Sequence, residues 1–348
     1  MSTIFHYPEE LSGSELDEYL ARGWFRMQQA VFTCRYLFQE GMLSTAVWLR
    51  LPLDGYHFSK SLRKLMKTNE KMFDISIGPA FIDTEKELLF ARYKDNFRGQ
   101  LSDSLYSALG LGREVIIYKS MQTEIRYKGE LVAFSIFDCG ESAILSVSGI
   151  YDPGYSSFSL GLYTMLLEVE YGLKNGYHYF YPGYIAPGRP IFEYKLRTKG
   201  TEYFDPDEDI WYSIDLLVRE ELPSARMDLA LSQLQAELSN LKIDFEKYLY
   251  PPHQVIASNP SRTQFFTAPI FLDCFLFYPL KERIIAEFDP HTDLYRIGRY
   301  IPFRDLEDRF YTDEISHNKQ FYYLMHLIDD VYETFDVEDA AEYISSIC

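Results

Sequence analysis

Cysteine is scarce in this 348-residue chain, and its four cysteines, Cys34, Cys139, Cys274 and Cys348, stand far apart. They form no CxxC pair, so we expect neither a metal site nor a disulfide framework, and we expect reduced thiols. No apolar run is long enough to span a bilayer, and the first residues, MSTIFHYPEELSG, lack the basic and apolar regions of a secretion signal. These absences predict a cytoplasmic location and no membrane partner.

Positive charge is also scarce, because 52 Asp and Glu against 34 Lys and Arg give a net charge of −18. Such an excess argues at first against a nucleic-acid partner. However, residues 1–200 hold 22 basic and 23 acidic side chains, whereas residues 201–348 hold 12 and 29. The first part is therefore nearly neutral and can carry a local basic patch, whereas the acidity belongs to the C-terminal part.

What the chain does have is an ordered series of β-rich and helical segments after residue 120. We expect three β-rich runs, at 124–127, 131–138 and 142–149. Lys128-Gly129 forms the hairpin turn between the first two. A helix follows, with one apolar face formed by Leu160, Tyr163, Leu167 and Tyr171. We expect Ser156, Ser157 or Ser159 to cap its start and Gly176 to end it in the left-handed conformation. A short strand, 177–181, then ends at Pro182-Gly183.

Strand, strand, strand, helix, strand is the order of a GNAT-like sheet, the mixed α/β sheet with flanking helices of acyl-CoA N-acyltransferases. We therefore expect an α/β fold of this class, with an additional acidic α+β part at the C-terminus. Three regions follow: 1–105, an N-terminal region with a basic helix; 106–205, the GNAT-like transferase domain; and 206–348, an acidic region of unknown role.

Short motifs in the same stretch carry a family resemblance. They are Gly129-Glu130-Leu131-Val132-Ala133, Tyr151-Asp152-Pro153, Ser159-Leu160-Gly161, Tyr181-Pro182-Gly183-Tyr184 and Tyr194-Lys195. In this order they resemble the C-terminal domain of arginyl-tRNA–protein transferases, the aminoacyltransferases of the N-degron pathway. Residues 22–26, RGWFR, and 49–51, LRL, resemble the N-terminal segment of that family. Its cysteine cluster is missing here, since only Cys34 remains near that place.

The resemblance implies an enzyme that moves an amino acid, arginine by this family, from aminoacyl-tRNA to the N-terminal amine of a protein. Aminoacyl-tRNA is then the co-substrate, with no separate cofactor, and the acceptor starts with Asp or Glu. Tyr184, Tyr194 and Lys195 are the catalytic candidates. The cations proposed for the acidic acceptor side chain are Lys195, Arg197 and Arg63. Further substrate-binding candidates are Arg92, Tyr93, Asp152, Ser159, Gly161 and Gly183.

A basic stripe marks the segment 58–71. Lys60, Arg63, Lys64, Lys67 and Lys71 recur at helical spacing, while Leu62, Leu65 and Met66 fall on another face. A basic stripe with few intervening acids suits phosphates, because each cation that neutralises a phosphate releases a counterion. We therefore predict that Lys60, Lys64, Lys67 and Lys71 bind tRNA, although a solvated helix face explains the same pattern.

Two other functions remain open. An acyl-CoA-dependent N-acyltransferase of the GNAT type needs a glycine-rich pyrophosphate loop before the helix, and residues 155–161, YSSFSLG, have one glycine and no Gln or Arg. A non-catalytic, transferase-like protein that binds a basic partner through its acidic C-terminal part is supported by the missing cysteine cluster. Hydrolysis through serine or cysteine is poorly supported, because no G-x-S-x-G is present and the seven histidines are scattered.

The acidic part is predicted to mix helices and strands. Leucines and aromatics three and four residues apart predict one long helix over 224–250, stopped by Pro251-Pro252. Strands are expected at 269–278, 281–288 and 294–303, and helices at 318–335 and 338–347.

Overall fold

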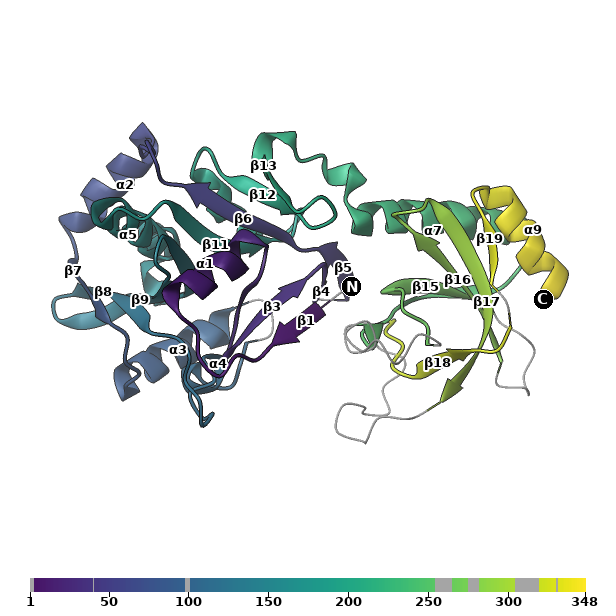
Figure 1. The fold of residues 1–348 in the computed structure, drawn as a ribbon, viewed down its shortest axis with the longest axis horizontal. Coiled ribbons are helices and arrows are strands. Elements are labelled where there is room, and N and C mark those ends of the chain that lie inside the picture. The colour runs from purple at the N-terminus through teal and green to yellow at the C-terminus, as the bar shows by residue number, and fades with distance from the viewer. Residues whose placement is uncertain are drawn as a thin grey trace. The chain divides into compact units, whose positions relative to one another are not determined.

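The computed structural model describes residues 3–39, 41–97, 101–253, 265–274, 282–303, 319–329 and 331–348. The chain forms two compact units, each described by itself (Figure 1). The larger unit comprises Phe5–Thr33 and Val47–Leu217. The smaller unit comprises Met1–Ile4, Cys34–Ala46 and Val218–Cys348.

These units divide the chain differently from the three regions expected from the sequence. Residues 47–105 share one unit with residues 106–205, because the strand that follows residue 46 joins the same sheet. Residues 34–46 lie instead with the C-terminal residues. None of the helices in the described ranges is long and apolar enough to cross a membrane.

An eight-stranded sheet is the centre of the larger unit, in the order β13-β12-β6-β11-β10-β9-β8-β7. Its strands are β6 Val47–Pro52, β7 Asp74–Pro79, β8 Ser120–Tyr127, β9 Glu130–Cys139, β10 Ala143–Tyr151, β11 Tyr179–Ile185, β12 Glu202–Asp205 and β13 Ile210–Ser213. Neighbours are antiparallel except β10 and β11, which are parallel and joined by helix α5, Leu160–Asn175. This arrangement confirms the GNAT-like mixed α/β fold class.

Helices cover both faces of this sheet. They are α1 Gly13–Ala21, α2 Lys60–Glu70, α3 Thr84–Asn96, α4 Leu105–Ala108, α5 and α6 Pro190–Glu193, with short 3-10 turns η1 Pro153–Phe158 and η2 Tyr194–Arg197. One core cluster contains residues of α2 and α5, whereas another contains residues of α3 and α4. The N-terminal residues form a smaller sheet of β1 Thr3–His6, β3 Ala30–Cys34 and β2 Phe25–Met27, and α1 lies between β1 and β2 in the chain.

Local details correct two expectations from the sequence, the end of one strand and the cap of α5, and confirm a third. Pro182-Gly183 does not end its strand, because β11 continues to Ile185 and the register with β6 shifts there instead. Ser159 takes the left-handed conformation at the start of α5, and no capping hydrogen bond comes from its side chain. Ser156 and Ser157 lie within η1. Gly176 ends α5 with φ +76°, as expected.

A buried ion pair ties the N-terminal segment to the large sheet. Arg26 on β2 donates from Nη1 to Asp138 on β9 at 2.9 Å, and their side chains are only 3% and 1% exposed. The Ser120 hydroxyl donates to the same carboxylate at 2.6 Å, and the guanidinium also lies 4.2 Å from the centre of the Tyr118 ring. Neighbouring protein groups therefore stabilise both buried charges. Arg26 of the RGWFR motif has a structural role.

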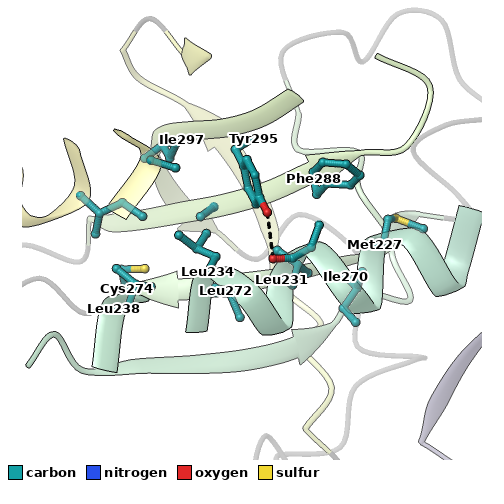
Figure 2. Close-up of a cluster of buried hydrophobic side chains, with 14 of the residues drawn as sticks. Met227, Leu231, Leu234, Leu238, Ile270, Leu272, Cys274, Phe288, Tyr295 and Ile297 are labelled. Atoms are coloured by element: carbon teal, nitrogen blue, oxygen red, sulfur yellow. Dashed lines mark hydrogen bonds between the residues drawn. The ribbon is translucent and has the colours of Figure 1, made fainter. Parts of the chain in front are cut away.

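In its described residues, the smaller unit is an antiparallel sheet packed against helices. The strands are β14 Phe245–Leu249, β15 Ile270–Cys274, β16 Arg283–Asp289, β17 Leu294–Phe303, β18 Leu324–Leu327 and β19 Tyr332–Thr334, with a separate hairpin, β4 Tyr36–Gln39 and β5 Met42–Thr45. The helices are α7 Pro223–Asn240 and α9 Val337–Ile347. Figure 2 shows Leu231, Leu234 and Leu238 of α7 facing the sheet, where the Tyr295 hydroxyl donates to the Ala230 carbonyl at 3.1 Å.

Two helix predictions in this unit are wrong. The helix expected over 224–250 ends at Asn240, and Phe245 and Tyr248 pair with β15 instead. Lys242 has φ +61°, which ends helical geometry before β14. In place of a helix over 318–335, the described residues contain β18 and β19. The expected strand at 269–278 is confirmed for 270–274, and its remainder lies outside the described residues.

We predict that Asp138→Ala lowers the free energy of unfolding of the larger unit by about 3–5 kcal/mol, because a buried Arg26 then lacks its counter-charge. The double variant Arg26→Met/Asp138→Leu should lose less, because it leaves no charge buried. Tryptophan fluorescence in a denaturant titration reports this unit, since Trp24, Trp48 and Trp211 all belong to it. Equal losses in both variants would contradict the explanation.

A matched control for this prediction is the exposed pair Lys174–Glu170, one turn apart on α5. Lys174→Ala should change stability by less than about 1 kcal/mol, because surface ion pairs contribute little.

Candidate active site

The strands β10 and β11 part soon after they pair. Their parallel register covers three residue pairs, from Ala143↔Tyr179 to Leu145↔Tyr181. Beyond these, among the described residues, β10 pairs with β9 alone and β11 with β6 alone, and each ladder shifts register at that place. We call this place, residues 146–151 of β10 and 182–185 of β11, the fork. Main-chain groups that face each other across the fork are left without a strand partner.

Helix α5 runs along β10 beneath the fork and approaches it closely. A Cβ at Gly161 would lie 3.1 Å from the Tyr151 ring, and a Cβ at Gly149 would lie 3.1 Å from Thr164 Oγ1. Farther along, a Cβ at Gly172 would lie 3.2 Å from Ile144. The two elements are thus antiparallel and in contact, which directs the start of α5 to the open end of the fork.

The junction between β10 and α5 contains several residues predicted for the site. The Tyr93 ring of α3 meets the Tyr151 ring edge-on, with centroids 5.3 Å apart. Arg92 Nη2 lies 3.5 Å from an Asp152 oxygen, and the other Asp152 oxygen accepts the Gly154 N–H at 2.8 Å. Asp152 therefore caps η1 and pairs with the exposed Arg92 at the junction.

Lys195 stands on the other side of the fork. Its amine donates to the Tyr184 carbonyl at 2.8 Å and lies 5.5 Å from the centre of the Tyr184 ring. A Cβ at Gly183 would lie 3.4 Å from the same amine, so the glycine leaves room for it. Burial of the amine lowers the pKa of Lys195 to about 8, and no carboxylate of a described residue pairs with it. An enclosed amine without an anion can accept an anionic ligand.

Tyr194, which precedes Lys195 in the chain, has its phenol near the junction. Its residue surface is 38% exposed, yet its phenol end is enclosed, and burial raises the pKa of Tyr194 well above its usual value. Tyr93, Glu168 and Tyr151 raise that pKa further by their proximity. The Tyr194 hydroxyl therefore stays protonated at neutral pH and can donate a hydrogen bond inside the fork.

Glu168 was not predicted from the sequence. It lies in the middle of α5, is fully buried, and faces the Ser135 and Ser146 hydroxyls of β9 and β10. Burial raises the pKa of this carboxyl to about 8. The sequence could have indicated its burial, because Glu168 falls four residues after Thr164 and beside Leu167, on the apolar side of the helix.

Other predicted residues lie elsewhere. Lys60, Arg63, Lys64, Lys67 and Lys71 are all exposed on or at the end of α2, and among the described residues none forms an ion pair. Asn69 of α2 donates to the Phe158 carbonyl at 3.0 Å, so α2 is attached to the start of α5. Arg197 is exposed at the end of η2. Neither Arg63 nor Arg197 has a side-chain bond to a described residue of the fork.

Two residues from the N-terminal motifs are structural. Gly23 has φ +73°, and a Cβ there would lie 2.4 Å from the Phe204 ring, so only glycine fits. Arg50 stacks on Tyr179 and Trp211 and pairs with Glu202 at 2.7 Å. Within the described ranges, no group of three or more His, Cys, Asp or Glu could hold a metal ion.

Comparison with known proteins gives related enzymes. The family model "Arginine-tRNA-protein transferase, C terminus" matches residues 84–205. An aspartate/glutamate leucyltransferase of Leptospira interrogans is 28% identical over 219 residues, 61% of this chain and 83% of that protein. One of Phenylobacterium zucineum is 27% identical over 229 residues, 63% of this chain and 88% of that protein.

Solved structures show partial likeness. FemX has a TM-score of 0.35 at 9% identity, over 57% of this chain and 68% of that one. A GCN5-related N-acetyltransferase from Anabaena variabilis has a TM-score of 0.32 at 8% identity, over 79% of this chain and 56% of that one.

The motifs of the fork, from Tyr151 to Lys195, lie inside the matched range, and the resemblance inferred from them is confirmed. Residues 84–205 of this chain are thus similar to the C-terminal region of arginine-tRNA-protein transferases, and the curated relatives are named aspartate/glutamate leucyltransferases.

Proposed function

We propose that the protein transfers an amino acid from aminoacyl-tRNA to the N-terminal amine of an acceptor protein, at the fork. One observation carries the proposal: Tyr184 and Lys195 lie on the β11 side of the fork, and the Tyr194 phenol lies near Tyr93 and Tyr151 at the β10–α5 junction. All of these residues lie in the range matched by the transferase family.

The reaction needs little acid–base work. The neutral amine attacks the ester carbonyl, a C–N bond forms, the bond to the ribose oxygen breaks, and that oxygen takes a proton from the amine. Catalysis then depends on holding the two substrates together and on stabilising the carbonyl oxygen as it gains charge. The protonated Tyr194 hydroxyl is the donor that we assign to this oxygen. Tyr184, which packs against Trp48 and Phe192, forms a wall of the same place.

Recognition of the acceptor is assigned to Lys195. An acidic first residue would bring a carboxylate to an amine that has no anionic partner among the described residues, and that contact would restore the full charge of Lys195. Gly183 keeps the approach open. Arg92 at the junction is the second cation near the fork, whereas Arg63 and Arg197 are exposed outside it.

Two donor amino acids are named by the comparisons. The resemblance in the sequence implied arginine, and the name of the matching family agrees with it. The curated relatives that match this chain over 83% and 88% of their own length are named aspartate/glutamate leucyltransferases. These names favour leucine as the donor. We propose leucine as the donor and keep arginine as the second candidate.

The tRNA is assigned to α2. Its basic stripe is exposed, unpaired within the described residues, and attached through Asn69 to the start of α5. The first N–H groups of α5 have no partner inside the helix, so they can bind a phosphate at the acceptor end of the same RNA.

We predict that the purified protein labels peptides that begin with Asp or Glu when it is supplied with leucyl-tRNA. Peptides that begin with Lys or Ala are the matched controls, and arginyl-tRNA is tested alongside. Labelling from arginyl-tRNA alone would make arginine the donor. No labelling from either, together with turnover of acetyl-CoA, would favour an acyl-CoA-dependent enzyme instead. No labelling and no turnover would favour a binding protein.

The same assay tests the assignment of Lys195. Lys195→Met should lower kcat/KM for an Asp-first peptide by at least about tenfold, since a contact between charged groups is lost. Arg197→Met, which removes an exposed neighbouring cation, should leave the preference for acidic first residues unchanged. Equal effects of the two variants would remove Lys195 from the recognition site.

We predict that Lys64→Glu/Lys67→Glu weakens tRNA binding and makes it less dependent on salt. Each lost phosphate contact should reduce the slope of log affinity against log salt by about 0.7–0.9. Titrations of labelled tRNA at several salt concentrations measure both effects. Lys119→Glu/Lys174→Glu, which reverses two exposed lysines outside α2, is the control. Equal slopes for wild type and the α2 variant would place the RNA elsewhere.

A further inference from the structure

Four aromatic rings gather where α2 meets the start of α5. They are Phe73 after α2, Tyr127 at the end of β8, and Tyr155 and Phe158 of η1. Phe73 is at the centre of the group. Its ring centroid lies 5.1 Å from that of Phe158, 6.0 Å from that of Tyr127 and 6.1 Å from that of Tyr155, each pair meeting edge-on. The Tyr127 and Tyr155 centroids are 5.9 Å apart. We call these four rings the aromatic cluster.

The aromatic cluster is only partly covered by the rest of the larger unit. Phe73 is 5% exposed and belongs to the core that α2 and α5 share. Tyr127, Tyr155 and Phe158 are half-buried and pack against that core, so each keeps part of its surface in contact with solvent. Aromatic surface that reaches solvent can stack with a flat ring of a ligand, and every nucleic-acid base offers such a ring.

Lysines stand on two sides of the aromatic cluster. Lys128 is exposed, and its amine lies 5.2 Å from the centre of the Tyr127 ring. Lys71, also exposed, follows α2 and ends the basic stripe of that helix beside the cluster. Glu70 and Asp74 are exposed acids of the turn that contains Lys71. The stripe on one side and Lys128 on the other therefore offer positive charge to phosphates, whereas the turn between α2 and β7 does not.

The aromatic cluster lies between the basic stripe and the fork. Asn69 of α2 is buried, and its amide donates to the Phe158 carbonyl at 3.0 Å, which fixes η1 against α2. Ser159, in the left-handed conformation, then turns the chain into α5. On the first turn of α5, a Cβ at Gly161 would lie 3.1 Å from the Tyr151 ring of the fork. Stripe, cluster and fork are thus joined by contacts through α2, η1 and the start of α5.

We propose that the aromatic cluster is a stacking platform for the unpaired bases at the 3′ end of the tRNA. This inference rests on the proposed function and deepens it. With the aminoacyl ester in the fork and the phosphates of the paired stem on α2, the unpaired nucleotides between them pass over the cluster. Proteins bind single-stranded RNA with aromatic side chains for its bases and cations for its phosphates. The cluster supplies the rings, and Lys128 supplies a cation beside them.

Binding of two RNAs tests the platform without any transfer reaction. One is tRNA that carries no amino acid, and the other is the same tRNA shortened so that it lacks its unpaired 3′ bases. Tyr127→Leu should weaken binding of the intact tRNA by about tenfold, the contribution expected of one stacked base, and leave binding of the shortened tRNA unchanged. Because no phosphate contact is lost, the slope of log affinity against log salt should stay the same. Fluorescence anisotropy of labelled RNA measures both quantities.

Further variants make the experiment specific to the aromatic cluster. Tyr155→Leu removes a ring from η1 and should act like Tyr127→Leu, whereas Tyr127→Phe keeps the ring and should bind intact tRNA like the wild type. Tyr106→Leu removes a ring that is 50% exposed on α4, outside the cluster, and should change neither affinity. Lys128→Met should weaken binding of intact tRNA and lower its salt slope by about 0.7, as expected for one phosphate contact of a single strand. Affinity for the shortened tRNA also shows that each variant is folded.

The outcomes separate the platform from the proposed transfer. Unchanged affinity of Tyr127→Leu and Tyr155→Leu for intact tRNA, or an equal loss for both RNAs, would overturn the platform, and continued labelling of peptides would then leave the transferase standing. Base-dependent binding of tRNA without any labelling would keep the platform and contradict the transfer. Failure of the wild type to bind intact tRNA would overturn both proposals.

Discussion

The separation of β10 from β11 is the constraint on which the rest of the larger unit depends. The two strands are parallel, so the chain must cross the sheet between them, and α5 makes that crossing in sixteen residues. Glycines 149, 161 and 172 leave room for the close packing of α5 on β10. The pairing then ends at Leu145 and Tyr181, and the start of α5 faces the open end. We propose that this geometry provides the site for both substrates, because main-chain groups, a helix start and aromatic side chains gather there.

The family motifs divide into two kinds when they are placed on this frame. Gly23, Arg26 and Arg50 hold the N-terminal segment against the sheet, through a glycine contact, a buried ion pair and a stacked guanidinium. Tyr194 and Lys195 instead approach the fork. A short sequence motif does not distinguish these two roles, because both need the same residue types. The burial and the contact partners of each side chain distinguish them.

Much of the larger unit could be predicted from the sequence, and the reasons are local. Lys128-Gly129 forms a hairpin, and the apolar face of α5 follows helical spacing. The smaller unit was harder to predict from the sequence, because apolar residues spaced three and four apart continue from α7 into β14. There, strand pairing overrides the helical pattern. Glu168 was missed since periodicity marks apolar positions and ignores a single acid among them. The parting of β10 and β11 depends on pairing over a long sequence distance, which no local pattern contains.

The central claim is that the fork binds the aminoacyl end of the RNA. A crystal structure of the protein with a stable amide analogue of 3′-leucyl-adenosine tests it most directly. The account predicts that the carbonyl oxygen of the analogue lies within hydrogen-bond distance of the Tyr194 hydroxyl, between β10 and β11, with the adenosine toward the start of α5. An analogue bound anywhere else, in the smaller unit or on the outer face of the sheet, would contradict it.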